Sequence, residues 1–163
     1  MTELIAELFN GVPKELAVFL MSALPVSELR GAIPTGIELW KLPVGEVYLL
    51  AILGNLLPFL PLFFGLELLR KVVGKVFPKG LILLDKYIDK SKRRMEGKYA
   101  AYGSFALFLF TAIPLPLTGL YTATTAAVAL KLPLKSTFLA VLAGVLTAGL
   151  VVTMLTVGVG ALT

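Results

Sequence analysis

The stretch AVFLMSALP at residues 17–25 returns with few changes as ALFLFTAIP at residues 106–114. Downstream of each copy stands the tripeptide KLP, first at residues 41–43 and again at residues 131–133. The separation is 89 residues at the front of the copies (17 to 106) and 90 at the back (41 to 131), so the second copy has gained one residue. Twofold internal repetition in an apolar chain is typical of secondary transporters.

The composition is that of an integral membrane protein, and we expect a single membrane domain over residues 1–163. Of the 163 residues 58% are hydrophobic and 15% charged, with a mean hydropathy of +0.91. Soluble domains are about 45–50% apolar and about 25% charged. The chain has neither Cys nor His, which excludes disulfides, thiolate metal sites and the commonest general base. Because phosphate-loop and protease motifs are also missing, we expect no enzyme, no cofactor and no bound metal.

The first copy combines an interrupted apolar stretch, residues 13–40, with a continuous one, residues 44–69. The interruption holds two helix breakers, a glycine and an ion pair, which are Pro25, Pro34, Gly31, Glu28 and Arg30. A straight helix would place all of them at the bilayer centre, at a high cost. Two arms of about 12 residues each instead reach about 18 Å, roughly to the midplane of a ~30 Å core and back. We therefore predict a re-entrant helical hairpin over 13–40 and a transmembrane helix over 44–69.

The second copy repeats this pattern, with a predicted re-entrant hairpin over 99–130 and a transmembrane helix over 134–161. Its hairpin tip, PLPLTGLYT, contains Pro114, Pro116, Thr118 and Gly119. Each copy crosses the membrane once, so the two copies, 13–69 and 99–163, are expected to be inverted, with their tips meeting near the midplane. In the alternative arrangement each interrupted stretch crosses the membrane fully, which gives parallel repeats and leaves the ion pair among lipid tails.

A basic linker over residues 70–98 joins the copies. It carries ten Lys and Arg residues against Asp85, Asp89 and Glu96, and its apolar residues share one face of a helix. The positive-inside rule places such an amphipathic helix on the cytoplasmic side of the cell membrane without a nucleic-acid partner. The acidic start of the chain then lies outside, where residues 1–12 suit a short interfacial helix. The expected protein is all-α and multi-pass.

Glu28 and Arg30 are the ionisable side chains predicted to lie deep in the bilayer, where charges mark functional sites by default. The planar fork of arginine suits a phosphate or carboxylate, and a buried carboxyl group can take up and release a proton. We therefore expect Arg30 to bind an anion and Glu28 to couple its release to H⁺, or to Na⁺. Two alternatives stay open at this point. Either the pair neutralises itself, or the tip is solvated near the surface.

Backbone groups and small residues complete the expected site. Half-helices that begin after Arg30 and after Thr118 would point unpaired N–H groups and positive dipole ends at the ligand. Gly31 and Gly119 would let the backbone approach closely, although a purely steric role is equally possible. Asn55 is expected at midplane depth, as a ligand contact or as an interhelical hydrogen bond.

A stripe of small residues lies on the last predicted helix. Gly144, which matches Gly54 of the first copy, stands between Ala140 and Ala148 at every fourth position. Such a stripe permits close helix contact, either within the fold or in a homodimer.

Three motifs carry a resemblance to a known family. They are SELRGAIPTGI at 27–37, LGN at 53–55 and AIPLPLTG at 112–119, and together they resemble the small multidrug export family, which is similar to the DedA or VTT-domain superfamily. The resemblance implies opposed re-entrant hairpins and the movement of lipid-linked phosphates, other lipids or exported small molecules. Residues 99–130 depart from the superfamily because they carry no charge, and Leu117 stands where relatives are expected to have glycine.

Three functions follow as hypotheses. The first is a secondary transporter that moves a small or lipid-linked anion through a midplane site, with Arg30 binding it and Glu28 coupling it to an ion gradient. The second is a lipid scramblase that needs no gradient. The third is a membrane scaffold, in which both charges serve folding alone. The sequence leaves open the substrate, the coupling ion, the direction of transport and the oligomeric state.

Overall fold

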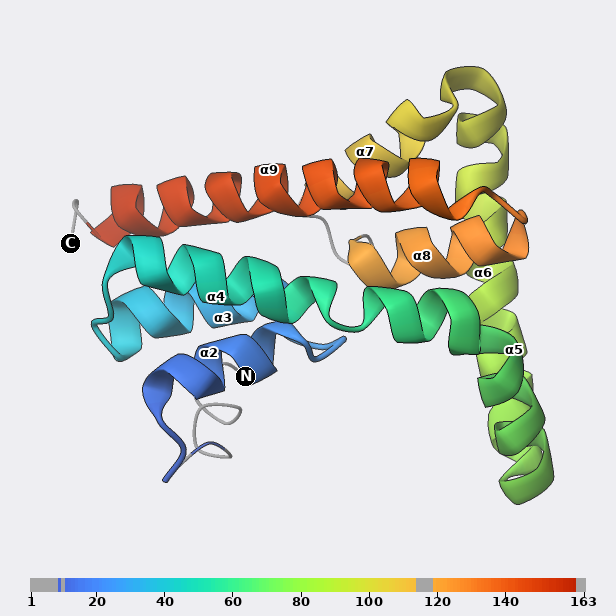
Figure 1. Ribbon diagram of the computed structural model, residues 1–163, viewed down its shortest axis with the longest axis horizontal. Helices are drawn as coiled ribbons and strands as arrows, with labels where there is room; N and C mark the ends of the chain where they lie inside the picture. The colour runs from blue at the N-terminus through green and yellow to red at the C-terminus, as the bar shows by residue number, and fades with distance from the viewer. Residues whose placement is uncertain (1–8, 10, 114–118, 161–163) are drawn as a thin grey trace. The chain divides into compact units, whose positions relative to one another are not determined.

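The computed structural model describes residue 9, residues 11–113 and residues 119–160 (Figure 1). All the regular elements in these residues are helices, so the expected all-helical class is confirmed for them. The chain divides into two compact units. The described part of unit 1 ends at Pro58 and resumes at Val145, whereas unit 2 runs from Phe59 to Gly144.

Two helical stretches are long and apolar enough to cross a membrane. They are Val44–Leu66, with 23 residues, and Leu134–Gly160, with 27 residues. A bilayer core of about 30 Å needs about 20 residues of helix. Both stretches lie where the sequence predicts a transmembrane helix.

Unit 1 contains three short α-helices, one π-helical segment and the later part of a long helix. These elements are α2 (Lys14–Ser22), α3 (Glu28–Pro34), η1 (Thr35–Leu39), α4 (Val44–Leu56) and α9 (Leu134–Gly160). Helix α2 contacts α3 and α4, and α3 also contacts α4. Val18, Met21, Ile33 and Val47 are fully buried. The core of unit 1 therefore lies among α2, α3 and α4.

Prolines mark the helix boundaries of unit 1, because proline has no N–H to donate. Pro13 directly precedes α2, Pro25 lies between α2 and α3, and Pro43 directly precedes α4. Pro34 ends α3, and the chain continues as η1, in which the N–H of Trp40 donates to the carbonyl of Thr35 at 3.0 Å. Such wide π-helical turns occur frequently at functional sites.

Unit 2 contains four helices and the first part of α9. The helices are α5 (Phe59–Val76), α6 (Pro78–Tyr102), α7 (Ser104–Ala112) and α8 (Leu120–Ala129). Helix α6 contacts α5, α7 and α8, and it runs across the line of α8 (Figure 1). Phe59 is fully buried between Phe63 and Phe138, with ring centroids 5.8 and 5.3 Å away.

The predicted linker, residues 70–98, consists of the end of α5 and most of α6. Helix α5 continues past residue 69 to Val76, and α6 runs on past residue 98 to Tyr102. Pro78 begins α6, because its fixed φ suits the first position of a helix and its missing N–H is not needed there. Residues 1–8 and 114–118, which include most of the predicted interfacial helix and the second hairpin tip, lie outside the described residues.

The lysines of the two KLP tripeptides have the same unusual backbone conformation. Lys41 has φ +54° and Lys131 has φ +56°, values that side chains with a Cβ atom rarely adopt. After each of them the chain passes through Leu and Pro into a long apolar helix. The repeated sequence therefore forms a repeated turn.

The matched glycines also make the same kind of contact in each unit. A side chain at Gly54 of α4 would collide with the carbonyl oxygen of Phe19 in α2. A side chain at Gly144 of α9 would come within 2.9 Å of the carbonyl oxygen of Phe108 in α7. Phe19 and Phe108 are 89 residues apart, which is the offset between the two copies. Each unit thus contains one close helix contact that only glycine allows.

Candidate functional site

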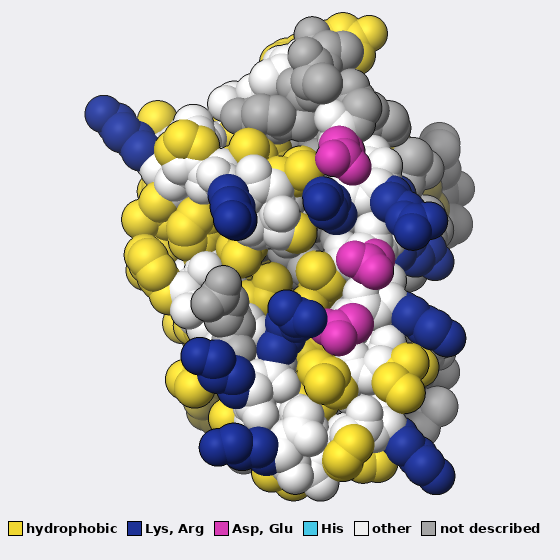
Figure 2. All heavy atoms as spheres, turned by 90° about the vertical axis from the view of Figure 1, so that its right-hand side faces the viewer, with side chains coloured by type: hydrophobic (Ala, Val, Ile, Leu, Met, Phe, Trp, Pro, Cys, Tyr) yellow, Lys and Arg dark blue, Asp and Glu magenta, His cyan; other side chains and the backbone are white. Residues whose placement is uncertain are grey.

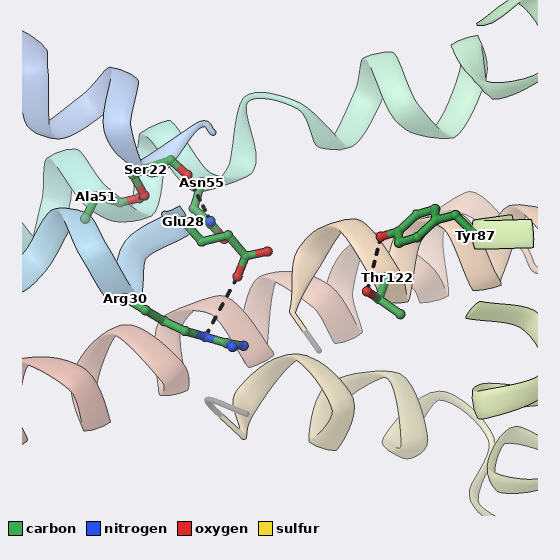
Figure 3. A network of polar contacts seen from close by, with 7 residues as sticks. All are labelled: Ser22, Glu28, Arg30, Ala51, Asn55, Tyr87 and Thr122. Carbon is green, nitrogen blue, oxygen red and sulfur yellow. Dashed lines mark hydrogen bonds and ion pairs between the residues drawn. The ribbon is translucent and has the colours of Figure 1, made fainter. Parts of the chain in front are cut away.

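Glu28 and Arg30 lie together at the start of α3 in unit 1. Figure 3 shows their charged groups turned toward one another, and Arg30 Nε is 3.8 Å from Glu28 Oε2. The Glu28 side chain is 10% exposed and that of Arg30 is 23% exposed. A distance of 3.8 Å is too long for a hydrogen bond. The attraction between these two atoms is therefore electrostatic, without the geometry of a tight hydrogen-bonded pair.

The backbone at Glu28 is strained. Its φ is +46°, while its N–H donates to the carbonyl of Leu24 at 2.9 Å. A residue with a Cβ atom pays roughly 1–2 kcal/mol for the left-handed conformation. Strain of this kind occurs at functional sites, where the surrounding structure holds a side chain in place. Here it holds a buried carboxylate at the break between α2 and α3.

Side chains hold the end of α2 on the neighbouring helix α4. Ser22 Oγ donates to the carbonyl of Ala51 at 2.5 Å, and Asn55 Nδ2 donates to the carbonyl of Ser22 at 3.1 Å (Figure 3). Ser27 Oγ donates to the carbonyl of Met21. Of the three carbonyls, that of Ser22 is at the end of α2, where the helix itself supplies no donor, and Asn55 supplies one. Asn55 thus makes an interhelical hydrogen bond, one of the two roles expected for it, and its ligand role stays a prediction.

Gly31, Pro34 and Thr35 lie on the same segment as the ion pair. A Cβ atom at Gly31 would be 2.9 Å from that of Ser27, so glycine gives Ser27 the room it needs. Pro34 cannot donate the hydrogen bond that would continue the ladder of α3. The hydroxyl of Thr35 is buried and has no hydrogen-bond partner among the described residues. A buried hydroxyl of this kind can bind a ligand.

In unit 2 the structure describes one predicted site residue, Gly119. Its φ is +108° and it is buried. Its N–H donates to the carbonyl of Phe110 at 3.2 Å, and its carbonyl accepts from the N–H of Ala123 at 3.0 Å. Only glycine adopts this conformation readily. Pro114, Pro116 and Thr118 lie outside the described residues.

Three residues near the first tip, Ser22, Ser27 and Thr35, are absent from the sequence-based site. The internal repeat could have indicated one of them, because Ser22 is matched 89 residues later by Thr111, another hydroxyl residue. Both residues are buried, and Thr111 Oγ1 donates to the carbonyl of Leu107 at 2.9 Å. A small hydroxyl residue three positions before a proline thus recurs in both copies.

The small-residue stripe of α9 is buried within the chain. Ala140 and Ala148 are almost fully buried, and Gly144 lies against Thr111 and Phe108 of α7. The expected contact within the fold is therefore present at Gly144. The homodimer stays a prediction.

The first tip offers a ligand two charged side chains, Glu28 and Arg30, together with polar groups of the backbone. Among the described residues there is no group of three or more His, Cys, Asp or Glu that could hold a metal ion. A mostly buried guanidinium group next to a carboxylate can exchange that partner for another anion, such as a phosphate.

A comparison with protein-family models places the site within a known family. The model described as "Putative small multi-drug export protein" matches residues 28–151, which begin at Glu28 and include all of unit 2. No curated protein and no solved structure matched the chain. The relationship to the DedA superfamily stays a prediction. Because the match covers more than half of an all-helical chain with two apolar stretches of membrane-spanning length, the protein belongs to this family of small multidrug export membrane proteins.

Proposed function

We propose that this protein is a secondary transporter that moves a small or lipid-linked anion across the membrane through a midplane site, to which the first hairpin contributes Glu28 and Arg30. The observation that carries the proposal is the buried ion pair at a helix break, 3.8 Å between Nε and Oε2. In a membrane protein, ionisable residues at such breaks mark substrate and ion pathways. The family description, which names drug export, agrees with transport outward.

Helix lengths support a hairpin that enters the membrane and returns. Helix α2 has nine residues, and α3 with η1 has 12 (7 + 5), which correspond to about 14 and about 18 Å at 1.5 Å per residue. Neither arm reaches across a core of about 30 Å. In unit 2 the arms are equally short, since α7 has nine residues and α8 has ten. We infer that both interrupted stretches are re-entrant, as the sequence predicts.

The two charges have different roles in this proposal. Arg30 binds the anionic group of the substrate, because its guanidinium fork presents paired donors to a phosphate or carboxylate. Glu28 neutralises Arg30 when the site is empty, and it takes up H⁺ or Na⁺ when the substrate replaces it as the partner of Arg30. Loading of the substrate is then coupled to loading of the ion. No bond of the substrate is broken in this cycle.

The test is uptake into proteoliposomes that hold the full-length chain. A labelled polyprenyl phosphate and a panel of small organic anions are offered with a pH gradient, with a Na⁺ gradient and with none. The variants Arg30→Ala, Arg30→Lys and Glu28→Gln are compared at matched incorporation. The control is the exposed pair Glu38 and Lys41, 3.5 Å apart, as Glu38→Gln and Lys41→Ala.

Flux in the unsubstituted protein is expected to follow one of the gradients. Arg30→Ala should reduce it at least about tenfold, because a hydrogen bond to a charged group contributes about 1.5–3 kcal/mol. Arg30→Lys should restore part of it, since lysine keeps the charge but not the fork. Glu28→Gln should lose the gradient-driven flux, and the control variants should retain it.

Two different outcomes would replace this proposal. Equilibration of the lipid without any gradient, with Glu28→Gln fully active, would identify a scramblase. A complete absence of flux, with Arg30→Ala lowering only the amount of folded protein, would identify a scaffold.

A further inference from the structure

Unit 2 contains a hollow whose lining combines apolar and basic residues. Its volume is about 370 Å³, and the apolar part of its lining includes Leu66 of α5 with Val128 and Ala129 of α8. The basic part of its lining consists of Arg70, Lys92 and Lys131. A ligand that suits such a lining has an anionic group joined to an apolar body.

The hollow lies where the apolar stretches of the chain end. Leu66 is the last residue of the first stretch that could cross a membrane, and Lys131 stands shortly before the second, which begins at Leu134. In a bilayer, the ends of such stretches lie at the level of the lipid headgroups. The basic residues of the hollow are therefore at the depth of lipid phosphates.

The charges of the hollow leave room for one anion. Arg70 Nε donates to Asp85 Oδ1 at 2.7 Å, and Asp89 is the second carboxylate of the lining. Among the described residues of the lining, three basic residues against two acidic ones leave a net charge of +1, which one phosphodiester neutralises. Asp85 also holds the Arg70 guanidinium in place, so the Arg70 side chain loses less conformational entropy when a ligand binds.

The outer face of α6 adds further positive charge. A second hollow, of about 460 Å³, is lined by Lys86, Asp89, Lys90, Arg93 and Arg94, and Figure 2 shows lysine and arginine side chains spread over this side of the molecule with few acidic ones. The opposite face of α6 packs against the rest of unit 2, because Ser91 is buried and Tyr87 makes a hydrogen bond with Thr122 of α8. The basic face is thus turned outward, as in helices that bind anionic membranes.

We infer that the hollow around Arg70, Lys92 and Lys131 binds the phosphate of an anionic phospholipid of the surrounding membrane. The three basic side chains surround the phosphate, and Leu66, Val128 and Ala129 contact the glycerol backbone and the first part of the acyl chains. This site involves neither Glu28 nor Arg30. It therefore does not depend on the proposed transport cycle.

The experiment measures lipid binding to the purified full-length chain in a neutral detergent. Phosphatidylglycerol and phosphatidylcholine are titrated separately, bound lipids are counted by native mass spectrometry, and the thermal-unfolding midpoint is recorded. Glycerol 3-phosphate serves as a soluble phosphate without acyl chains. The variants are Lys92→Gln and Lys131→Asn, since asparagine tolerates the positive φ of Lys131. Lys79→Gln, on the same helix but outside both linings, is the control.

Phosphatidylglycerol is expected to bind and to raise the unfolding midpoint, whereas phosphatidylcholine and glycerol 3-phosphate are not. Lys92→Gln and Lys131→Asn should each weaken phosphatidylglycerol binding about fivefold, the factor that corresponds to about 1 kcal/mol per basic residue at an anionic surface. Lys79→Gln should bind as the unsubstituted chain does.

Three results would overturn the inference. Equal binding of phosphatidylcholine would show that the charge of the lipid is irrelevant. An equal loss in Lys79→Gln would show a diffuse attraction to α6 in place of a site. Equal stabilisation by glycerol 3-phosphate would assign the hollow to a soluble phosphate compound.

Discussion

Gly54 and Gly144 each let a helix backbone touch a carbonyl oxygen of another helix. Alanine at Gly54 would place its Cβ on the carbonyl oxygen of Phe19, and alanine at Gly144 would place it 2.5 Å from the Cβ of Thr111. Neither backbone carbonyl nor β-carbon can move away as a flexible side chain can. These two positions therefore require glycine for steric reasons.

We expect Gly54→Ala and Gly144→Ala each to lower the free energy of unfolding by about 1–3 kcal/mol, the usual effect of an overpacked contact. Gly45→Ala and Gly158→Ala are matched controls, because they lie in the same two helices and face open space. Unfolding in mixed detergent micelles measures all four variants. Equal stability of Gly54→Ala and Gly45→Ala would contradict the close contact in unit 1.

Asn55 is a residue at which the two copies differ in chemistry. Its counterpart 90 residues later is Val145, and both side chains are almost fully buried. In unit 1 the amide of Asn55 donates to the carbonyl of Ser22. The polar connection from the transmembrane segment to the helix break is thus made in the copy that carries the ion pair.

Asn55→Val should lower the free energy of unfolding by about 1–3 kcal/mol, because it leaves the buried carbonyl of Ser22 without this donor. Thermal unfolding in detergent and transport in proteoliposomes should be measured on the same preparation. A variant with unchanged stability and a raised KM for the transported anion would instead make Asn55 a ligand contact.

At the scale of the helices, α6 is more than a linker between the two copies. The predicted amphipathic character agrees with a buried Ser91 on one side and the basic residues of the second hollow on the other. The helix also contacts α5, α7 and α8. With α8, the second arm of the second predicted hairpin, it makes a hydrogen bond through Tyr87 and Thr122. A change in the position of α6 would therefore act directly on that arm.

Tyr87→Phe should weaken the connection between α6 and α8 by about 0.5–1.5 kcal/mol, the net contribution of one hydrogen bond. Tyr102→Phe is the control, since Tyr102 lies on the same helix with its side chain 65% exposed. Hydrogen–deuterium exchange of α8 in detergent is the measurement. Exchange should become faster in Tyr87→Phe alone, and an equal change in both variants would contradict the connection.

For the whole molecule, the inverted and the parallel arrangements differ in the orientation of the second copy in the membrane. The repeated KLP turn and the repeated glycine contact show that the two copies fold alike locally. Local likeness does not set the orientation of a copy in the membrane. That depends on how many times the chain crosses the membrane between equivalent positions of the two copies.

The absence of cysteine makes this orientation measurable without further changes to the chain. Gly45 and Lys135 are 90 residues apart, exposed, and placed in the first turn of α4 and α9. In intact cells we expect a membrane-impermeant thiol reagent to label Gly45→Cys but not Lys135→Cys, because inverted repeats place these positions on opposite sides. Lys79→Cys, in the predicted cytoplasmic linker, should also remain unlabelled by the reagent. Labelling of both turns from one side would support the parallel arrangement.

The sequence by itself was sufficient to predict the all-helical class, the family and the two long apolar stretches. These features depend on local properties of the chain, such as the missing N–H of Pro25 and the run of uncharged residues after Pro43. Glu28 and Arg30 could also be chosen as candidate site residues from the sequence, because charges in an apolar stretch stand out without any structure; their role in transport stays a prediction.

Other features required the tertiary structure. The bond from Asn55 to Ser22 joins residues 33 positions apart, and the hollow in unit 2 brings Arg70, Lys92 and Lys131 together from three segments. No local pattern specifies such partners, because helix packing decides which faces meet. For the same reason Arg70 and Lys131 were predictable as basic residues near the membrane, whereas their common hollow was visible only in the folded chain.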